Sequence, residues 1–217
     1  MDPFRLCLAF GPVAIYAVLL GAINLSRRPF AVSGTRDAAA LGLAVSGLVI
    51  VGPIELFLPP SLAIRFGPYV WVLMAAMYAM GLIAALLWLR PRLVIYNISI
   101  DELRPSLADL VPRLDPEARW AGDSLALPTL GVQLYVDAIK WMRNVSLTPV
   151  GPHQNQAGWR HLERYLAATL ARLEVARNPR GVSLLTSGMM ILGMLGWHIT
   201  RNPEAAFQAL FKMFRLD

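Results

Sequence analysis

The sequence of 217 residues is poor in cysteine, in lysine and in charged residues of either sign. Its single cysteine, Cys7, excludes an internal disulfide framework and lies in an apolar stretch that suits a small buried side chain. Lys140 and Lys212 are the only lysines, so the net charge of +6 comes almost entirely from arginine. Charged residues make up 16% of the chain and hydrophobic ones 56%, which is too apolar for one soluble domain of this size.

Sequence motifs for metal, nucleotide or nucleic-acid chemistry are also missing. The three histidines are scattered and one cysteine cannot complete a zinc site, so no metal is expected. No glycine-rich phosphate loop follows a strand, and no cofactor or catalytic residue is predicted. A nucleic-acid face could be read into one arginine cluster, but attraction to anionic lipid headgroups explains it with fewer assumptions. That cluster comprises Arg160, Arg164, Arg172, Arg177 and Arg180.

Four long apolar runs dominate the sequence. They cover residues 4–25, 38–58, 69–89 and 182–200. Each approaches or exceeds the length of about 20 residues that a helix needs to cross the hydrocarbon core, and arginines stand only at their ends. The first run has no small-residue cleavage site and is followed by Arg27 and Arg28, so we expect it to be retained rather than removed as a signal peptide. The sequence therefore predicts a multi-pass α-helical membrane protein with about four transmembrane helices.

The distribution of arginines predicts an orientation for these helices. One side carries Arg27, Arg28, Arg36, Arg90 and Arg92, whereas the other offers only Arg5 and Arg65. Because cytoplasmic loops are enriched in basic residues, the first loop and the polar domain are expected in the cytoplasm, with the N-terminus outside. The fourth run has basic flanks on both sides and is rich in glycine. It could span while packing closely on another helix, or it could be partly re-entrant.

Residues 90–181 read as a soluble α+β domain inserted between the third and fourth helices. Residues 92–98 are rich in β-branched and aromatic side chains and predict a strand. An amphipathic helix follows, for which a start at Asp101 fits better than one at Ser99 because of Pro105, and Pro112 should end or kink it. The acidic residues around this helix are read as its cap and solvated face. They are Asp101, Glu102, Asp109, Asp115 and Glu117.

The second half of this domain predicts three or four antiparallel strands within residues 120–148, where Val132, Leu134 and Val136 alternate with Gln133, Tyr135 and Asp137. A helix is then expected over residues 157–177, with apolar residues at helical spacing on one face: Trp159, Leu162, Leu166, Leu170 and Leu173. The order predicts helices laid on one face of a mainly antiparallel sheet. The chain is thus expected to comprise a three-helix transmembrane region, the soluble domain, a fourth transmembrane helix and an amphipathic tail. Their ranges are 1–89, 90–181, 182–200 and 201–217. The tail is expected to lie in the membrane interface, the alternative being that its phenylalanine-rich face packs on the other helices.

Glu55 is the first candidate for a functional residue. It is the only carboxylate well inside an apolar run, and it follows Gly52 and Pro53, which weaken the helix there. The alternative interpretation is an ion pair with Arg65 or Arg5 near the outer interface. A second set of candidates would bind lipid headgroups. That set is Arg27, Arg28, Arg90, Arg92, Arg177 and Arg180.

Two stretches resemble a known family. Residues 24–30 (NLSRRPF) and 36–60 (RDAAALGLAVSGLVIVGPIELFLPP) are similar to an uncharacterised multi-pass membrane protein family of planctomycete-type bacteria. The similarity covers the first three helices and, more loosely, the polar domain. It implies the same architecture and a bacterial inner membrane, and it brings no activity and no functional residue.

Two hypotheses about function follow. The sequence favours a non-catalytic anchor or scaffold over an enzyme. Its helices would position a cytoplasmic module that docks a protein partner or senses the bilayer. The alternative is a small transporter or membrane-embedded enzyme that handles a lipid-like substrate near Glu55. The expected partners are the lipid bilayer and a protein or a second copy of the chain, and no nucleic acid.

Overall fold

A computed structural model describes residues 3–54, 69–139, 142–152, 154–201 and 203–204. The chain divides into two compact units. The helical unit falls within residues 1–20, 39–88 and 183–217, and the sheet unit comprises residues 21–38 and 89–182. The chain therefore passes from one unit to the other four times. Each unit is considered by itself below.

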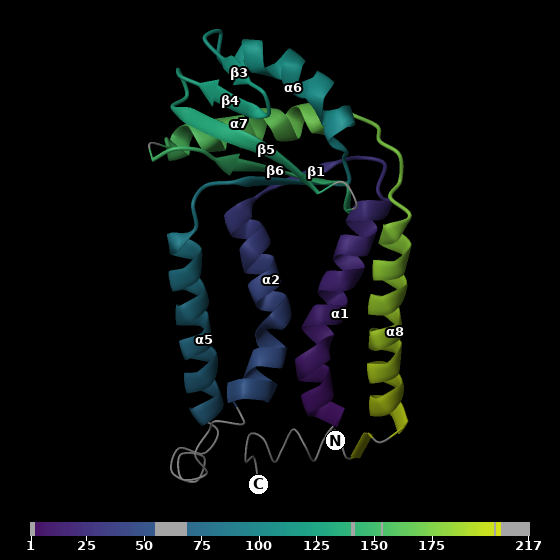
Figure 1. The fold of residues 1–217 in the computed structure, drawn as a ribbon. Coiled ribbons are helices and arrows are strands. Elements are labelled where there is room, and N and C mark those ends of the chain that lie inside the picture. Colours follow the sequence, from purple (N-terminus) through teal and green to yellow (C-terminus); the bar gives the residue numbers. More distant parts are fainter. Residues whose placement is uncertain (1–2, 55–68, 140–141, 153, 202, 205–217) are drawn as a thin grey trace. The chain divides into compact units, whose positions relative to one another are not determined.

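Four long helices arise from the four apolar runs (Figure 1). They are α1 (Pro3–Leu25), α2 (Gly34–Val49), α5 (Tyr69–Trp88) and α8 (Arg180–Arg201). Within the described part of the chain, these are the helices long and apolar enough to cross a membrane. A π-helical turn, η1 (Ile50–Ile54), continues α2 where Gly52 and Pro53 stand. Pro53 has no backbone N–H to donate, which favours a change of hydrogen-bond register at this point.

Small residues bring the helices of this unit close together. A Cβ atom at Gly47 of α2 would lie 1.8 Å from the Leu8 carbonyl oxygen of α1. At Gly188 of α8 it would lie 2.7 Å from the carbonyl oxygen of Ala14. The fourth apolar run is thus one continuous helix that packs closely on another, as one of the two sequence interpretations expected. Not every apolar side chain of this unit is covered by a neighbouring helix: Leu87 of α5 is 82% exposed.

The sheet unit contains six strands in the order β1-β2-β6-β5-β4-β3, and every neighbouring pair is antiparallel. The strands are β1 (Phe30–Ser33), β2 (Leu93–Tyr96), β3 (Arg119–Ala121), β4 (Ser124–Leu127), β5 (Val132–Ile139) and β6 (Asn144–Pro149). Two helices accompany them, α6 (Ile100–Leu114) and α7 (Gln156–Leu170). The predicted α+β architecture is confirmed, and the segment expected to hold three or four antiparallel strands within residues 120–148 holds four.

Both helices pack on one face of the sheet and enclose a single apolar core. β5 shows why: Val132, Leu134 and Val136 are buried, while the residues between them are exposed. This alternation of period two directs one set of side chains toward the helices and leaves the other set on the open face. Leu162 and Leu166 of α7 are completely buried in this core, and they stand at the helical spacing expected from the sequence.

The strand β1 was not predicted. It belongs to the loop between the first two apolar runs, and it pairs with β2 from Phe30 opposite Tyr96 to Ser33 opposite Leu93. Residues 21–38 therefore fold with residues 89–182, whereas the sequence placed them with the first three helices. A four-residue strand is too short to show a clear alternation, and its partner lies far along the chain. Only the folded sheet reveals it.

The helix boundaries in the sheet unit correct two predictions. Ser99, not Asp101, is the N-cap of α6: its side chain accepts from the Glu102 N–H, and Glu102 accepts from the Ser99 N–H at 2.9 Å. This capping box outweighs Pro105, which is exposed inside the helix, so the carbonyl group left without its amide donor stays close to water. The helix also continues past Pro112.

The helix α7 ends at Leu170 and not at Arg177 as expected. The chain beyond it runs beside the segment after α1, where the Val175 N–H donates to the Arg27 carbonyl oxygen at 2.8 Å. That long-range hydrogen bond needs an extended backbone and is incompatible with a further helical turn. The interfacial helix expected in the tail falls almost wholly outside the described residues.

Candidate functional site

The residues singled out from the sequence fall into two groups. Glu55 and Arg65 lie outside the described residues, and the π turn η1 ends one position before Glu55. The six proposed headgroup-binding arginines all belong to the sheet unit. Arg92 is half-buried, and the other five are exposed. These are Arg27, Arg28, Arg90, Arg177 and Arg180.

The fold brings the segment that carries Arg27 and Arg28 beside the segment that carries Arg177 and Arg180. The Asn178 N–H donates to the Asn24 carbonyl oxygen at 3.0 Å, next to the bond between Val175 and Arg27. The segment after α1 and the segment before α8 therefore run side by side. Arg92 is held differently: its carbonyl oxygen accepts from the Gly34 N–H at 2.8 Å, and its guanidinium lies 4.0 Å from the Asp37 carboxylate.

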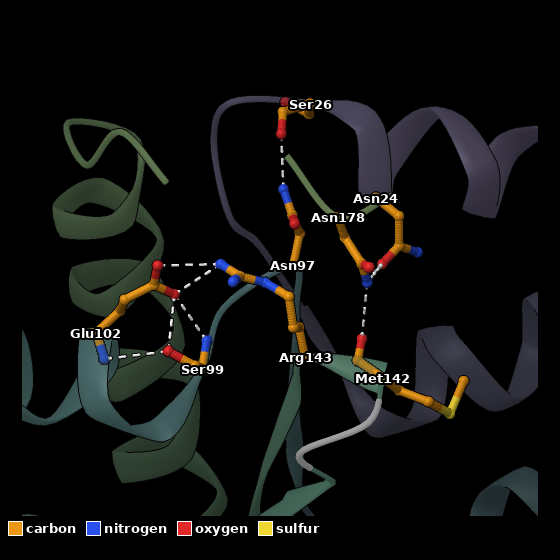
Figure 2. Close-up of polar contacts among 8 residues, drawn as sticks. All are labelled: Asn24, Ser26, Asn97, Ser99, Glu102, Met142, Arg143 and Asn178. Carbon is orange, nitrogen blue, oxygen red and sulfur yellow. Dashed lines mark hydrogen bonds and ion pairs between the residues drawn. The ribbon is translucent and has the colours of Figure 1, made fainter. Parts of the chain in front are cut away.

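A cluster of polar groups joins these segments, and we call it the polar joint (Figure 2). It consists of Asn24, Ser26, Asn97, Ser99, Glu102, Met142, Arg143 and Asn178. They come from the end of α1, the turn between β2 and α6, the turn between β5 and β6, and the approach to α8. Four stretches far apart in the sequence thus meet at one place within the sheet unit.

Amide side chains form one half of the polar joint. The Asn178 Nδ2 donates to Asn24 Oδ1 at 3.0 Å and to the Met142 carbonyl oxygen at 3.2 Å. The Asn97 Nδ2 donates to the Ser26 carbonyl oxygen at 2.7 Å. All three asparagines are buried, where an amide is stable only if it is hydrogen-bonded. These bonds therefore specify which segments lie together.

An ion pair forms the other half. The Arg143 Nη2 donates to both carboxylate oxygens of Glu102, at 3.0 and 2.8 Å, and the Ser99 hydroxyl donates to the same carboxylate at 2.9 Å. Burial raises the pKa of Glu102, but the hydrogen bonds from Ser99 and the charge of Arg143 outweigh burial and leave this pKa below its usual value. Glu102 is thus held as a carboxylate near neutral pH. It is unsuited to act as a general acid there.

Two residues of the polar joint have a left-handed backbone. Asn97 has φ +60° and Arg143 has φ +52°. Asparagine tolerates this region, but for arginine it is uncommon and costs on the order of 1–3 kcal/mol. The Arg143 carbonyl oxygen accepts from the Ile98 N–H at 2.8 Å, so the two turns hold each other in place. The local cost is offset by that bond and by the ion pair with Glu102.

The groups of the polar joint are suited to holding segments together by hydrogen bonds and are not suited to catalysis. Its carboxylate is already saturated by Ser99 and Arg143, and amides are poor nucleophiles and poor bases. Within the described ranges, no group of three or more metal-binding side chains occurs. Arg143 Nε and Asn97 Oδ1 are both buried without a partner among the described atoms. We interpret the polar joint as the set of hydrogen bonds that holds the end of α1 and the approach to α8 against the rest of the sheet unit.

Sequence reasoning identified part of this arrangement and missed the rest. The spacing of Ser99 and Glu102 matches the capping box that the structure contains, but the sequence analysis preferred a helix start at Asp101. Nothing in the sequence pattern distinguished Asn24, Asn97 or Asn178 from loop asparagines. One buried carboxylate was misjudged: Asp115, read as part of a solvated face, has 0% of its surface exposed.

Comparisons with models of protein families, with curated proteins and with solved structures found no match.

Replacing Asn178 by leucine tests the polar joint. The change removes one amide donor from Asn24 Oδ1 and from the Met142 carbonyl oxygen, so we expect the free energy of unfolding to fall by about 2–3 kcal/mol. Urea unfolding of the full chain in mild detergent, followed by tryptophan fluorescence, measures this. In the double variant Asn24→Leu/Asn178→Leu the loss should be smaller than the sum of the single losses. Simple additivity would contradict direct coupling.

Proposed function

We propose that the chain is an integral protein of a bacterial inner membrane, in which four helices anchor a cytoplasmic, non-catalytic module that binds a protein partner. The observation that carries this proposal is which segments of the chain form the sheet unit. Its two parts, residues 21–38 and 89–182, adjoin all four apolar helices. Such a module is held to its anchors by four covalent connections, because each end of its two segments continues into an apolar helix.

The charge of the sheet unit supports the cytoplasmic side. Each apolar helix joins this unit at one of its ends, so the four joined ends belong to the same side of a bilayer if the helices span it. The arginines next to these ends are those that the sequence analysis singled out, with Arg27 and Arg28 following α1 and Arg90 following α5. Basic residues at the ends of transmembrane segments favour the cytoplasmic side.

The open face of the sheet supports partner binding. On β5, Tyr135 and Ile139 point away from the helical core and are 42% and 41% exposed, with Asp137 between them. Ser146 and Thr148 of β6 lie opposite Asp137 and Tyr135 on the same face. Aromatic and aliphatic side chains among short polar ones are typical of protein-binding surfaces.

One experiment tests both the side and the partner. In a Cys7→Ala background, Tyr135→Cys places a thiol on the open face, and Ala108→Cys places one on the exposed surface of α6. We expect a membrane-impermeant thiol reagent to label both positions in everted vesicles and neither in intact cells. A thiol-directed crosslinker should then capture a distinct protein from position 135 and not from position 108.

The outcomes separate the parts of this proposal. Labelling of both cysteines from outside intact cells would reverse the orientation. Equal crosslinking from both positions, or none from position 135, would contradict partner binding at the open face. An adduct of twice the mass of the chain would identify the partner as a second copy.

A further inference from the structure

A basic cavity of about 360 Å³ lies within the sheet unit and has no part in the polar joint. Its walls come from three places that are distant in sequence: the end of β1 with the first turn of α2, the approach to β2, and the first turns of α7. Each contributes one arginine, namely Arg36, Arg92 and Arg160. Its volume is near the lower end of the range of about 300–1,000 Å³ that is common for ligand pockets.

The three guanidinium groups are unequally neutralised. Arg36 lies at 3.4 Å from the Glu163 carboxylate, the only carboxylate among the described residues that line this cavity. Arg92 lies at 4.0 Å from Asp37, the limit of an ion pair, and Asp37 also accepts a hydrogen bond from the Tyr96 hydroxyl. Arg160 has no carboxylate within ion-pair distance among the described residues. A net positive charge therefore remains along the walls.

Arg92 is the most informative of the three. Its side chain packs over Gly34, where an added Cβ would lie 2.1 Å from Arg92 Cγ. Its Nε is fully covered and has no acceptor among the described residues. The rest of the side chain is open, being 41% exposed and part of the cavity lining, so an anion in the cavity would place acceptor oxygens beside it. The absence of a side chain at Gly34 is what allows Arg92 to lie there.

Two residues with hydroxyl side chains complete the polar lining. Ser33 and Thr35 line the cavity at the start of α2, a helix of 16 residues. The N-terminus of a helix carries a partial positive charge that favours a nearby anion. The Gly34 N–H at this end of α2 already donates to the Arg92 carbonyl oxygen. Arginine guanidinium groups and hydroxyls together form a donor set that suits the oxygens of a tetrahedral phosphate.

We propose that this cavity binds the phosphate group of an anionic phosphate ester. Its occupant is either the headgroup of an anionic phospholipid or a small soluble phosphate ester, since both present the same oxygens. Arg92 and Arg160 hold the anion, Ser33 and Thr35 donate to its remaining oxygens, and Glu163 opposes it. The site does not depend on the protein-binding role proposed for the open face.

Native mass spectrometry and thermal unfolding of the full chain test the site. In neutral detergent, the probes are inorganic phosphate and glycerol 3-phosphate, with chloride at equal ionic strength as the reference. In nanodiscs, phosphatidylglycerol or phosphatidate is added to phosphatidylcholine. We expect one bound phosphate-bearing molecule and a rise in unfolding temperature. Binding in detergent identifies a soluble ester, and binding only in the anionic nanodiscs identifies a lipid headgroup.

Four variants make the test specific. Arg160→Gln, an exposed position that should fold normally, and Arg92→Gln should each weaken binding by about tenfold or more, because each removes charge-assisted hydrogen bonds. Glu163→Gln should strengthen binding, since it removes the carboxylate that opposes an anion among the described lining residues. Arg172→Gln makes the same change of charge at an exposed arginine outside the cavity and should bind like the wild type.

The inference is overturned by any of three results. One is the absence of binding by every probe in both detergent and nanodiscs. Another is stabilisation that chloride reproduces at the same ionic strength, since that reports general screening. The third is an equal loss of binding in Arg160→Gln and Arg172→Gln, which would place the effect in overall charge and not in this cavity.

Discussion

Replacing Asp115 by asparagine will lower the free energy of unfolding of the sheet unit by about 2–4 kcal/mol. Asp115 follows α6 and is completely buried. Its carboxylate accepts from the Glu117 N–H at 3.0 Å, and from the Thr129 N–H and the Thr129 hydroxyl, both at 2.8 Å. An asparagine keeps one acceptor oxygen but turns an amide NH₂ toward groups that are themselves donors. The substitution therefore breaks the link between the end of α6 and the turn after β4.

The matched control is Asp109→Asn. Asp109 lies on α6 and is exposed, and its replacement removes the same charge. We therefore expect the free energy of unfolding to change by no more than about 0.5 kcal/mol. Urea unfolding of the full chain in detergent measures both variants. Equal losses in the two would show that the effect comes from net charge and not from the buried hydrogen bonds.

The same carboxylate makes stability depend on pH. Burial raises the pKa of Asp115, but hydrogen bonds from Thr129, Glu117 and Leu130 outweigh burial and hold this pKa below its usual value. A lowered folded-state pKa contributes stability that is fully present above the unfolded value of about 3.9 and is lost as the pH falls through the folded value. The wild type should therefore lose stability below about pH 4, and Asp115→Asn should lose less over that window.

The features that the sequence revealed are those with a local signature. The apolar runs set the extents of α1, α5 and α8 to within a few residues, because length and composition alone define such helices. The alternation along β5 and the leucine spacing on α7 are equally local, and both gave the correct buried faces. Helix and strand periods are encoded over short windows, so a single sequence is enough to show them.

The features that the sequence did not reveal depend on distant partners. β1 is a strand only because β2 lies beside it. Asn24 is a buried link only because Asn178 approaches it, and Asp115 is buried only because Thr129 supplies donors. The basic cavity is the strongest case. Its three arginines stand in three separate segments, and only the folded sheet places them around one space.

The close approach of α1 and α2 depends on one glycine in the same way. A Cβ at Gly47 would lie 1.8 Å from the carbonyl oxygen of Leu8 and 3.3 Å from the Cα of Ala9. Both of these are backbone atoms, so no flexible side chain can move aside to make room. Without a hydrophobic drive between helices in lipid, close van der Waals packing of small residues is a main source of association. Any side chain here must push the two helices apart.

We therefore expect Gly47→Ala to destabilise the helical unit by about 1–3 kcal/mol, the usual effect of overpacking. Gly11→Ala is the matched control, because Gly11 is on α1 and an added Cβ there would meet nothing within 4 Å. Removing a glycine from a helix interior stabilises it by up to about 1 kcal/mol, so this control should be neutral or slightly stabilising. Thermal unfolding in detergent of the two variants and the wild type measures the difference. Equal behaviour of the two variants would show that α1 and α2 do not meet at Gly47, since helix propensity alone changes both in the same direction.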